Sequence, residues 1–312
     1  MDVDVTVVQF TARPGWGRFA YLPALVILAR RLKREGARVD VVHAHVHWIG
    51  WVAVQLGTLL RRPVVITEHS TEWPTHTLSR RSLRRAKSAF RRASLVCPVN
   101  RQLQDAIESY GVRARFRIVP NAVDTKTFHP RPTGREGAPK RLINVALHTE
   151  RKGLDVLLQA VAKLLASRPD LTLDLVGEGP STAQLRKLAT TLGIAERVRF
   201  RGTAPPSEIA DALRESDVFV FASLSENMPL GVLEALCCGL PVAATNVGGI
   251  PEAVGADGAL APPGDADALA SAIEDVLERY SAFDRSEIAA RAATRYSFEA
   301  VGAIWDEIYR SL

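Results

Sequence analysis

Short apolar runs alternate with amphipathic stretches along most of this chain of 312 residues. Runs that are apolar, or that alternate between apolar and polar residues, predict buried strands. They fall at 3–10, 39–45, 63–69, 95–99, 117–121, 142–147, 171–176, 197–200, 217–222 and 242–245. Helical spacing predicts helices at 21–35, 48–60, 79–92, 153–167, 182–192, 207–215, 229–238, 265–280 and 297–312. Strands that alternate with helices are typical of parallel, doubly wound α/β sheets.

A segment rich in proline and glycine, 128–139, interrupts this alternation and predicts a linker. The alternation restarts after it, and the chain is long enough for two domains of ordinary size. We therefore predict two Rossmann-like α/β domains that face a cleft, at 1–135 and 136–296. The last segment, 297–312, predicts a helix with five apolar residues on one face, namely Phe298, Val301, Ile304, Trp305 and Ile308.

One stretch of the second domain carries two glutamates at the carboxyl end of a predicted strand. Strand 217–222 leads into a loop that contains Glu226, Pro229 suits the first turn of a helix, and Glu234 lies inside that helix. Gly239 provides the stop signal. In open α/β sheets ligands bind at the carboxyl ends of the strands, and the free N–H groups of a first helical turn suit a phosphate. The pattern predicts a ligand site at this edge of the sheet.

Composition is that of a globular protein, with 47% hydrophobic and 24% charged residues. Three cysteines, Cys97, Cys237 and Cys238, make no disulfide framework and have no zinc-binding spacing, which favours a reducing cytosol and no metal. The first residues lack the basic region of a signal peptide, and no apolar run approaches the ~20 residues of a membrane helix.

The net charge of +6 is unevenly distributed. Residues 1–135 contain 23 Lys and Arg against 9 Asp and Glu, whereas 136–312 contain 17 against 25. Seven of the basic residues lie in 79–92, where Leu83, Ala86 and Phe90 fall at helical spacing. This basic amphipathic helix predicts either docking to an anionic membrane surface or an ordinary solvated helix. A nucleic-acid site is disfavoured because aromatic residues do not alternate with the arginines.

Several segments resemble the signature of family 4 retaining glycosyltransferases. These are the glutamate stretch 223–241, Gly-Gly-Ile-Pro-Glu at 248–252, Val-Pro-Asn-Ala-Val-Asp at 119–124 with Phe128, and Lys-Gly at 152–153. The resemblance covers nearly the whole chain. It implies the GT-B fold, two Rossmann-like doubly wound parallel-sheet domains facing a cleft, with the last helix packed back on the first domain.

The resemblance also implies roles for individual residues. Lys152 would hold the donor's diphosphate, and a cation at the start of a helix, where the helix dipole disfavours it, supports that reading. Glu226 would contact the sugar, and Glu234 the ribose hydroxyls. His45 would assist the reacting centre, the alternative being a structural histidine, and His69 is a candidate on the acceptor side.

The remaining residues implied to bind the nucleotide sugar lie in three loops of the second domain. They are Gly177, Glu178 and Gly179, then Arg201, Gly202 and Thr203, and then Asn227, Met228, Pro229 and Leu230.

The chain departs from the family pattern at several points. Leu147 stands where an arginine is usual, Ala122 and Asn227 replace glycines, and the chain starts at what matches the third strand of the first domain. We therefore expect an N-terminally incomplete first domain, without the family's glycine loop and with exposed sheet edges that favour a homo- or hetero-oligomer.

The implied reaction transfers a sugar from a UDP- or GDP-sugar to a carbohydrate or lipid-linked acceptor, with retention, no metal and no other cofactor. We expect a cytoplasmic protein, peripheral to the inner membrane, in polysaccharide or glycolipid synthesis. Two alternatives stay open: a GT-B nucleotide-sugar epimerase, and a non-catalytic nucleotide-binding partner of a full-length enzyme.

Overall fold

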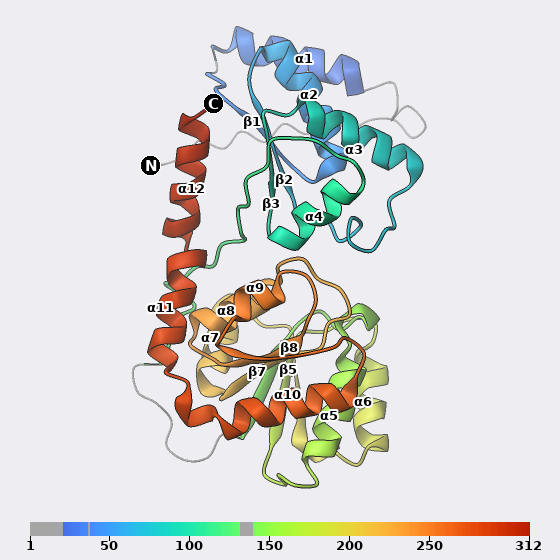
Figure 1. The fold of residues 1–312 in the computed structure, drawn as a ribbon, viewed down its shortest axis with the longest axis vertical. Helices are drawn as coiled ribbons and strands as arrows, with labels where there is room; N and C mark the ends of the chain where they lie inside the picture. The colour runs from blue at the N-terminus through green and yellow to red at the C-terminus, as the bar shows by residue number, and fades with distance from the viewer. Residues whose placement is uncertain (1–20, 37, 132–139) are drawn as a thin grey trace.

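The computed structural model describes residues 21–36, 38–131 and 140–312. The predicted strand at 3–10, and with it the expected incomplete start of the first domain, lies outside the described residues, as does most of the predicted linker at 128–139. Figure 1 shows two lobes, one above the other, with the last two helices running along one side of both.

The first lobe contains a parallel sheet with helices packed against it. Within the described residues this sheet has the order β1-β2-β3. Its strands are β1 (Val42–His45), β2 (Val64–Glu68) and β3 (Leu95–Pro98). Its helices are α1 (Tyr21–Arg34), α2 (His47–Leu60), α3 (Arg80–Arg92) and α4 (Arg101–Ser109). His45 pairs with Thr67 across β1 and β2, so the ends of these strands meet at one edge.

The second lobe contains a larger sheet whose strands are also parallel, with the order β6-β5-β4-β7-β8-β9 in the described residues. The strands are β4 (Arg141–Val145), β5 (Thr172–Val176), β6 (Val198–Gly202), β7 (Val218–Phe221), β8 (Val242–Thr245) and β9 (Gly258–Ala261). The strand order reverses direction between β4 and β7, and ligands bind at such switch points in doubly wound sheets. The predicted parallel α/β class is confirmed.

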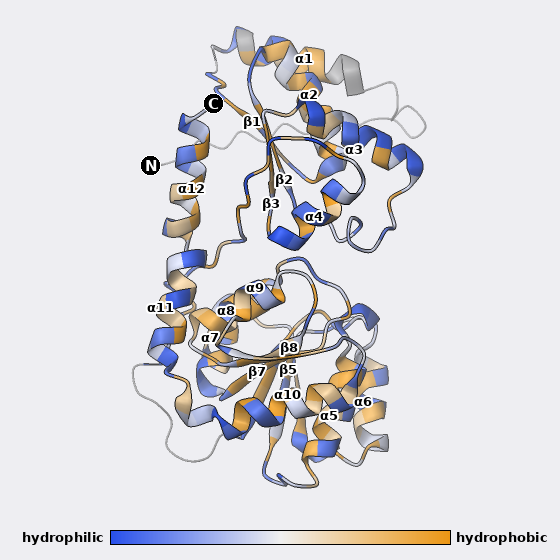
Figure 2. Ribbon diagram, in the orientation of Figure 1, coloured by the Kyte–Doolittle hydropathy of each residue, from blue (hydrophilic) through white to orange (hydrophobic). Residues whose placement is uncertain are grey.

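Helices cover both faces of the second sheet. They are α5 (Leu154–Leu164), α6 (Thr182–Thr191), α7 (Pro206–Glu215), α8 (Leu230–Cys237), α9 (Ile250–Val254), α10 (Ala266–Glu278) and α11 (Arg285–Tyr296), with short 3-10 turns η1 (Glu150–Lys152), η2 (Ala195–Arg197) and η3 (Tyr280–Ala282). Figure 2 shows apolar residues concentrated where helices and strands meet.

The predicted strand at 117–121 is wrong, although the segment follows β3. The N–H of Arg117 bonds the carbonyl of Val96, and the N–H of Val119 bonds that of Pro98, both at 3.1 Å. Pro98 and Pro120 have no N–H to donate, so a regular ladder does not continue here. Helix α11 was not predicted because its buried face consists largely of alanines, which leave little apolar contrast.

The final helix, α12 (Phe298–Arg310), contacts the first sheet. Val301 and Ile308 are buried in one cluster with Val65, Leu95 and Cys97. Ile304 and Trp305 pack partly against the same cluster, whereas Phe298 is 56% exposed. The predicted apolar face is therefore wrong at Phe298, which lies in the first turn, before the helix reaches the sheet.

Helix α3 buries one narrow stripe and leaves its basic side in solvent. The side chain of Ser79 caps its first turn by accepting a hydrogen bond from the N–H of Ser82 at 3.1 Å. Ala86, Ala89 and Phe90 are fully buried in the first lobe. Figure 2 shows the remainder of α3 as strongly hydrophilic.

Truncation of the α12 contact tests how strongly the last helix is held. Ile308 is fully buried, so Ile308→Ala should lower the free energy of unfolding by about 2–5 kcal/mol. Phe298→Ala, on the same helix but exposed, should change it by less than about 0.5 kcal/mol. Urea unfolding followed by circular dichroism measures both, and equal effects of the two substitutions would contradict this packing.

Candidate active site

A cluster of charged side chains lies where β4 and β7 end in the second lobe. The ammonium of Lys152 lies 2.5 Å from the Glu226 carboxylate, and the guanidinium of Arg151 lies 3.3 Å from the same oxygen. The hydroxyl of Ser223 donates to it at 2.9 Å. Glu226 is 8% exposed, so these three donors supply the hydrogen bonds that a nearly buried carboxylate needs.

Close backbone packing positions this cluster. Gly153 has a positive φ of 59°, and a Cβ there would lie 2.2 Å from the carbonyl oxygen of Ala222. Gly248 also has a positive φ, and its Cβ would lie 2.1 Å from the carbonyl oxygen of Glu226. Only glycine fits both constraints. The turn that carries Lys152 and the loop that carries Glu226 are therefore pressed together at the edge of the sheet.

The two nucleotide loops predicted at 177–179 and 201–203 adjoin each other. The N–H of Gly177 bonds the carbonyl of Gly202 at 2.7 Å, and the N–H of His148 bonds the carbonyl of Glu178 at 3.0 Å. The side chain of Arg201 turns away to pair with Asp174 at 2.7 Å. The side chain of Arg201 is therefore used within the second lobe, and the expected contact of its backbone with a ligand stays a prediction.

The N–H of Gly179 donates to the Thr182 hydroxyl at 3.0 Å, which ties the first of these loops to α6. Thr203 follows Gly202 directly and is exposed. The two loops thus extend the edge on which the charged cluster lies.

Glu234 lies on α8 with its side chain mostly covered. Burial raises the pKa of Glu234 to about 7, and no hydrogen bond to its carboxylate is found within the described residues. Hydrogen bonds from hydroxyl groups would stabilise the charged form of such a carboxylate and favour its ionisation. Glu234 is therefore suited to receive a ligand's hydroxyl groups.

The first turn of α8 provides free backbone donors beside the charged cluster. Pro229 is the N-cap residue, and the N–H groups that follow it lack partners four residues earlier in the helix. Met228 and Pro229 are buried, whereas Leu230 is 48% exposed. This helix end suits an anion, as the sequence predicted.

Three asparagine side chains join this loop to the first lobe. Asn227 donates to the carbonyl of His69 at 2.8 Å, and Asn100 donates to the carbonyl of Asn227 at 2.9 Å. Asn121 donates to the carbonyl of Met228 at 2.8 Å. The carboxyl ends of the two sheets therefore face each other across residues 227 and 228.

On the first lobe, His45 lies at the end of β1 among other histidines. Its ring stacks on His43 at 4.9 Å and lies 5.8 Å from the ring of His69. Burial, with a smaller contribution from His69, lowers the pKa of His45. His45 is therefore neutral at physiological pH and available to accept a proton or a hydrogen bond.

The neighbouring His43 links β1 to the last helix. Its ring bonds the hydroxyl of Tyr309 at 2.6 Å and that of Thr67 at 2.7 Å. Burial, followed by the charge of His45, lowers the pKa of His43 to about 4. His43 is therefore neutral, is hydrogen-bonded at both ring nitrogens, and provides a fixed surface on which His45 stacks.

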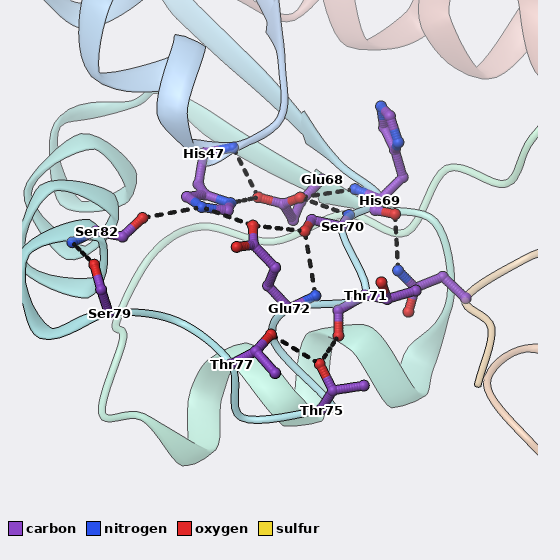
Figure 3. A network of polar contacts seen from close by, with 11 residues as sticks. His47, Glu68, His69, Ser70, Thr71, Glu72, Thr75, Thr77, Ser79 and Ser82 are labelled. Atoms are coloured by element: carbon purple, nitrogen blue, oxygen red, sulfur yellow. Dashed lines mark hydrogen bonds and ion pairs between the residues drawn. The ribbon is translucent and has the colours of Figure 1, made fainter. Parts of the chain in front are cut away.

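A second polar network lies beside the histidines, around the fully buried Glu68 (Figure 3). One carboxylate oxygen accepts from the N–H groups of His69 and Ser70 at 2.9 and 2.8 Å. The other accepts from the N–H of His47 at 2.9 Å and lies 3.1 Å from its ring Nδ1. Glu68 therefore fixes the chain on both sides of the first lobe's carboxyl edge.

The structure brings Lys152 and Glu226 into direct contact and connects them to His45 only indirectly, through Asn227 and His69. Our sequence analysis assigned no role to Arg151, Ser223, Asn100, Asn121 or the pair His47 and Glu68. Asn121 and Ser223 lie within recognised motifs and were the accessible signals. Arg151, Asn100 and the pair of His47 and Glu68 have their roles through contacts between segments that are separated along the chain.

The described residues show neither a metal-binding cluster nor a membrane-spanning helix. Across 21–36, 38–131 and 140–312, no group of three or more His, Cys, Asp or Glu side chains is placed to hold a metal ion. Within those same ranges, no helix has the length and apolar character needed to cross a membrane. The predictions about metals and cellular location stay predictions.

Comparison with known families covers both lobes. Residues 139–279 match the family described as Glycosyl transferases group 1, and residues 2–127 match the one described as Glycosyltransferase Family 4.

Individual relatives of this chain are also glycosyltransferases. A GDP-mannose-dependent alpha-(1-6)-phosphatidylinositol monomannoside mannosyltransferase of Mycolicibacterium smegmatis is 33% identical over 80% of this chain and 71% of its own. WcaL of Escherichia coli, a glycosyltransferase named for colanic acid biosynthesis, is 30% identical over 81% of this chain. This chain spans 64% of the length of WcaL.

Among solved structures, HepE of Anabaena in complex with UDP superposes with a TM-score of 0.83 at 25% identity. The match covers 97% of this chain and 85% of HepE. The chain therefore belongs to the group 1, family 4 glycosyltransferases. The predicted family, the GT-B fold and the class of protein are confirmed.

Substitution of Glu68 tests the network in Figure 3. Glu68→Gln keeps the shape but turns an NH₂ group toward N–H donors, so the free energy of unfolding should fall by about 1–3 kcal/mol. Glu72→Gln, whose side chain is 41% exposed, should change it by less than about 0.5 kcal/mol. Urea unfolding measures both, and an unchanged midpoint for Glu68→Gln would refute this role.

Proposed function

We propose that this protein transfers a sugar from a UDP- or GDP-sugar to an acceptor hydroxyl, with retention at the anomeric carbon. The observation that carries the proposal is the contact of Lys152 with Glu226 beside the switch point of the second sheet, with Glu234 on the helix that follows the same loop, in a chain of this family. HepE was solved with UDP, which supports a nucleoside diphosphate here.

In the proposed complex Lys152 neutralises the diphosphate, assisted by the first-turn amides of α8. As the bond between the anomeric carbon and the phosphate oxygen breaks, negative charge grows on the leaving diphosphate. A fixed cation and helix amides stabilise that charge more than they stabilise the ground state. Arg151, 3.3 Å from Glu226, provides a second cation in a chain where Leu147 replaces the family arginine.

The acceptor oxygen forms the new bond to the anomeric carbon on the face that the diphosphate leaves. Its proton passes to the departing phosphate oxygen, so atoms and charge balance without a separate base. Glu226 orients the sugar hydroxyls, Glu234 accepts from the ribose, and the neutral His45 contacts the sugar from the first lobe. His69 borders the acceptor side. These assignments rest on the geometry and on the family pattern together.

For the acceptor we propose a carbohydrate or a lipid-linked carbohydrate at the cytoplasmic face of the inner membrane. The support is the basic first domain and the exposed arginines of α3, which suit an anionic surface. WcaL is named for colanic acid biosynthesis, and the mycobacterial relative for a phosphatidylinositol mannoside acceptor. Association with a second copy or with another transferase belongs to the same proposal.

Substitution of Lys152 should reduce catalytic turnover without preventing the protein from folding. Lys152→Ala should reduce kcat by roughly 10²–10³-fold, the usual effect of removing one preorganised group that stabilises developing charge. The control Lys163→Ala removes a lysine that pairs with Asp267 on the outer surface, and it should leave turnover unchanged. Release of UDP or GDP from matched sugar donors measures both variants, and normal turnover by Lys152→Ala would overturn the assignment.

Nucleotide binding should depend on the charge of Glu234. Because the ionised carboxylate accepts from both ribose hydroxyls, binding favours loss of its proton, and affinity should rise with pH through about 7. With this pKa, the ionised fraction of Glu234 rises about tenfold from pH 6 to pH 8, so the Kd for the nucleotide should fall by about tenfold.

Isothermal titration with UDP and GDP measures this dependence. Glu234→Gln removes the titrating group but keeps its shape, so its binding should show only the pH dependence that belongs to the nucleotide phosphate. Identical pH profiles for wild type and Glu234→Gln would contradict the role of Glu234. Binding without turnover would favour the non-catalytic partner.

A further inference from the structure

A cavity of about 380 Å³ lies on the first lobe, between the first turns of α2 and α3. One side presents Arg81, Arg85 and the hydroxyl of Ser82. The opposite side presents the indole of Trp48 and the side chain of Ile49. The cavity is therefore cationic on one side and apolar on the other, and it is separate from the donor cluster of the second lobe.

The arginines of this cavity lack acidic partners. Within the described ranges no carboxylate forms an ion pair with Arg81 or Arg85, and the first turn of α3 contains no acidic residue. The amino-terminal end of a helix carries a partial positive charge, so the helix dipole of α3 disfavours the two arginines there. The Arg85 guanidinium lies over the Trp51 ring at 5.3 Å, which orders it without neutralising it. A bound anion would relieve this concentration of positive charge.

The apolar wall restricts the kind of anion. Trp48 is 52% exposed and Ile49 is 49% exposed, although both are large and apolar. A small soluble anion would gain nothing from them, whereas an amphiphile would cover them. Indole rings next to cationic side chains are characteristic of membrane interfaces.

The floor of the cavity is held in one position by the network of Figure 3. Glu68 fixes Nδ1 of His47, whose Nε2 lies 3.4 Å from the Ser82 hydroxyl and 3.6 Å from a Glu72 oxygen. The preceding Val46 has a φ of +65°, a strained conformation for a β-branched residue. Strain of this kind is found at functional sites, where surrounding contacts maintain it.

The same residues connect the cavity to the proposed reaction centre. His47 follows His45 by two residues, and Glu68 precedes His69. The floor of the cavity is therefore joined, through the chain and through the bonds of Glu68, to the segments that carry His45 and His69.

We propose that this cavity seats the phosphate of a lipid-linked acceptor. Arg81, Arg85 and Ser82 bind the phosphate, and the start of the lipid chain covers Trp48 and Ile49. This inference rests on the proposed sugar transfer, because it names the class of acceptor for that reaction. The basic charge of α3 alone would give only diffuse attraction to an anionic membrane, whereas this cavity would bind one phosphate at a defined position.

Vesicle binding tests the site with a matched pair of double variants. Arg81→Gln with Arg85→Gln removes the two cavity arginines, and Arg84→Gln with Arg91→Gln removes two exposed arginines of the same helix outside the cavity. The probe is phosphatidylcholine vesicles containing about one fifth phosphatidic acid. Co-sedimentation of the full chain should weaken at least tenfold for the cavity pair and less than twofold for the control pair. Equal weakening would overturn the proposal in favour of general surface charge.

A second arm distinguishes a lipid phosphate from free phosphate. Trp48→Ala should weaken vesicle binding severalfold, and titration with inorganic phosphate should detect much weaker binding than vesicles give. Tight binding of inorganic phosphate that is insensitive to Trp48→Ala would overturn the lipid assignment. Circular dichroism confirms folding of each variant.

Nucleotide titration separates this inference from the proposed function. UDP or GDP should bind the cavity variants with wild-type affinity. Wild-type protein that binds neither nucleotide would defeat the proposed transfer and leave the vesicle result standing by itself. Failure in the vesicle arms with normal nucleotide binding would defeat only the cavity.

Discussion

The loop of residues 226–228 is held from both lobes, and the candidate active site depends on that constraint. Lys152 and Ser223 hold the Glu226 side chain from the second lobe, and Asn100 and Asn121 hold the backbone just after it from the first. Parallel strands bring their carboxyl ends to one edge, but nothing in a single sheet makes two such edges face each other. These amide contacts do so, and they place the carboxyl end of the first sheet opposite Glu226 and the first turn of α8.

The Lys152 and Glu226 pair gives this arrangement its chemical character. The nearly buried carboxylate of Glu226 accepts from three donors, and one of them is the side-chain nitrogen of Lys152. A diphosphate that arrives at the α8 helix end would share Lys152 with Glu226, so donor binding and sugar orientation become linked through one ammonium group. Glu234 differs because no donor to its carboxylate is found in the part of the chain that the structure describes, so a ligand's hydroxyl groups would supply bonds that it lacks.

Much of the fold was predictable because apolar periodicity reports burial directly. Strand β8 was predicted with its observed bounds, and the strand, helix and stop signals correctly placed Glu226 in the loop before α8 and Glu234 inside that helix. The structure of the segment at 117–121 was not predicted correctly. Prolines have no N–H group to donate to a neighbouring strand, and an apolar pattern does not show this. Asn100 and Arg151 could not be assigned from the sequence, since each has its role only through a partner more than seventy residues away.

Hydrogen–deuterium exchange of the protein with and without UDP or GDP tests the central claim, that the nucleotide binds where the two carboxyl edges meet. The account predicts slower exchange in 149–153, 177–179 and 226–236 when the nucleotide that binds is present. It also predicts slower exchange at 68–70 and 100, because the asparagine contacts join the two lobes. Protection confined to the outer helices α10 and α11, with these loops unchanged, would contradict it.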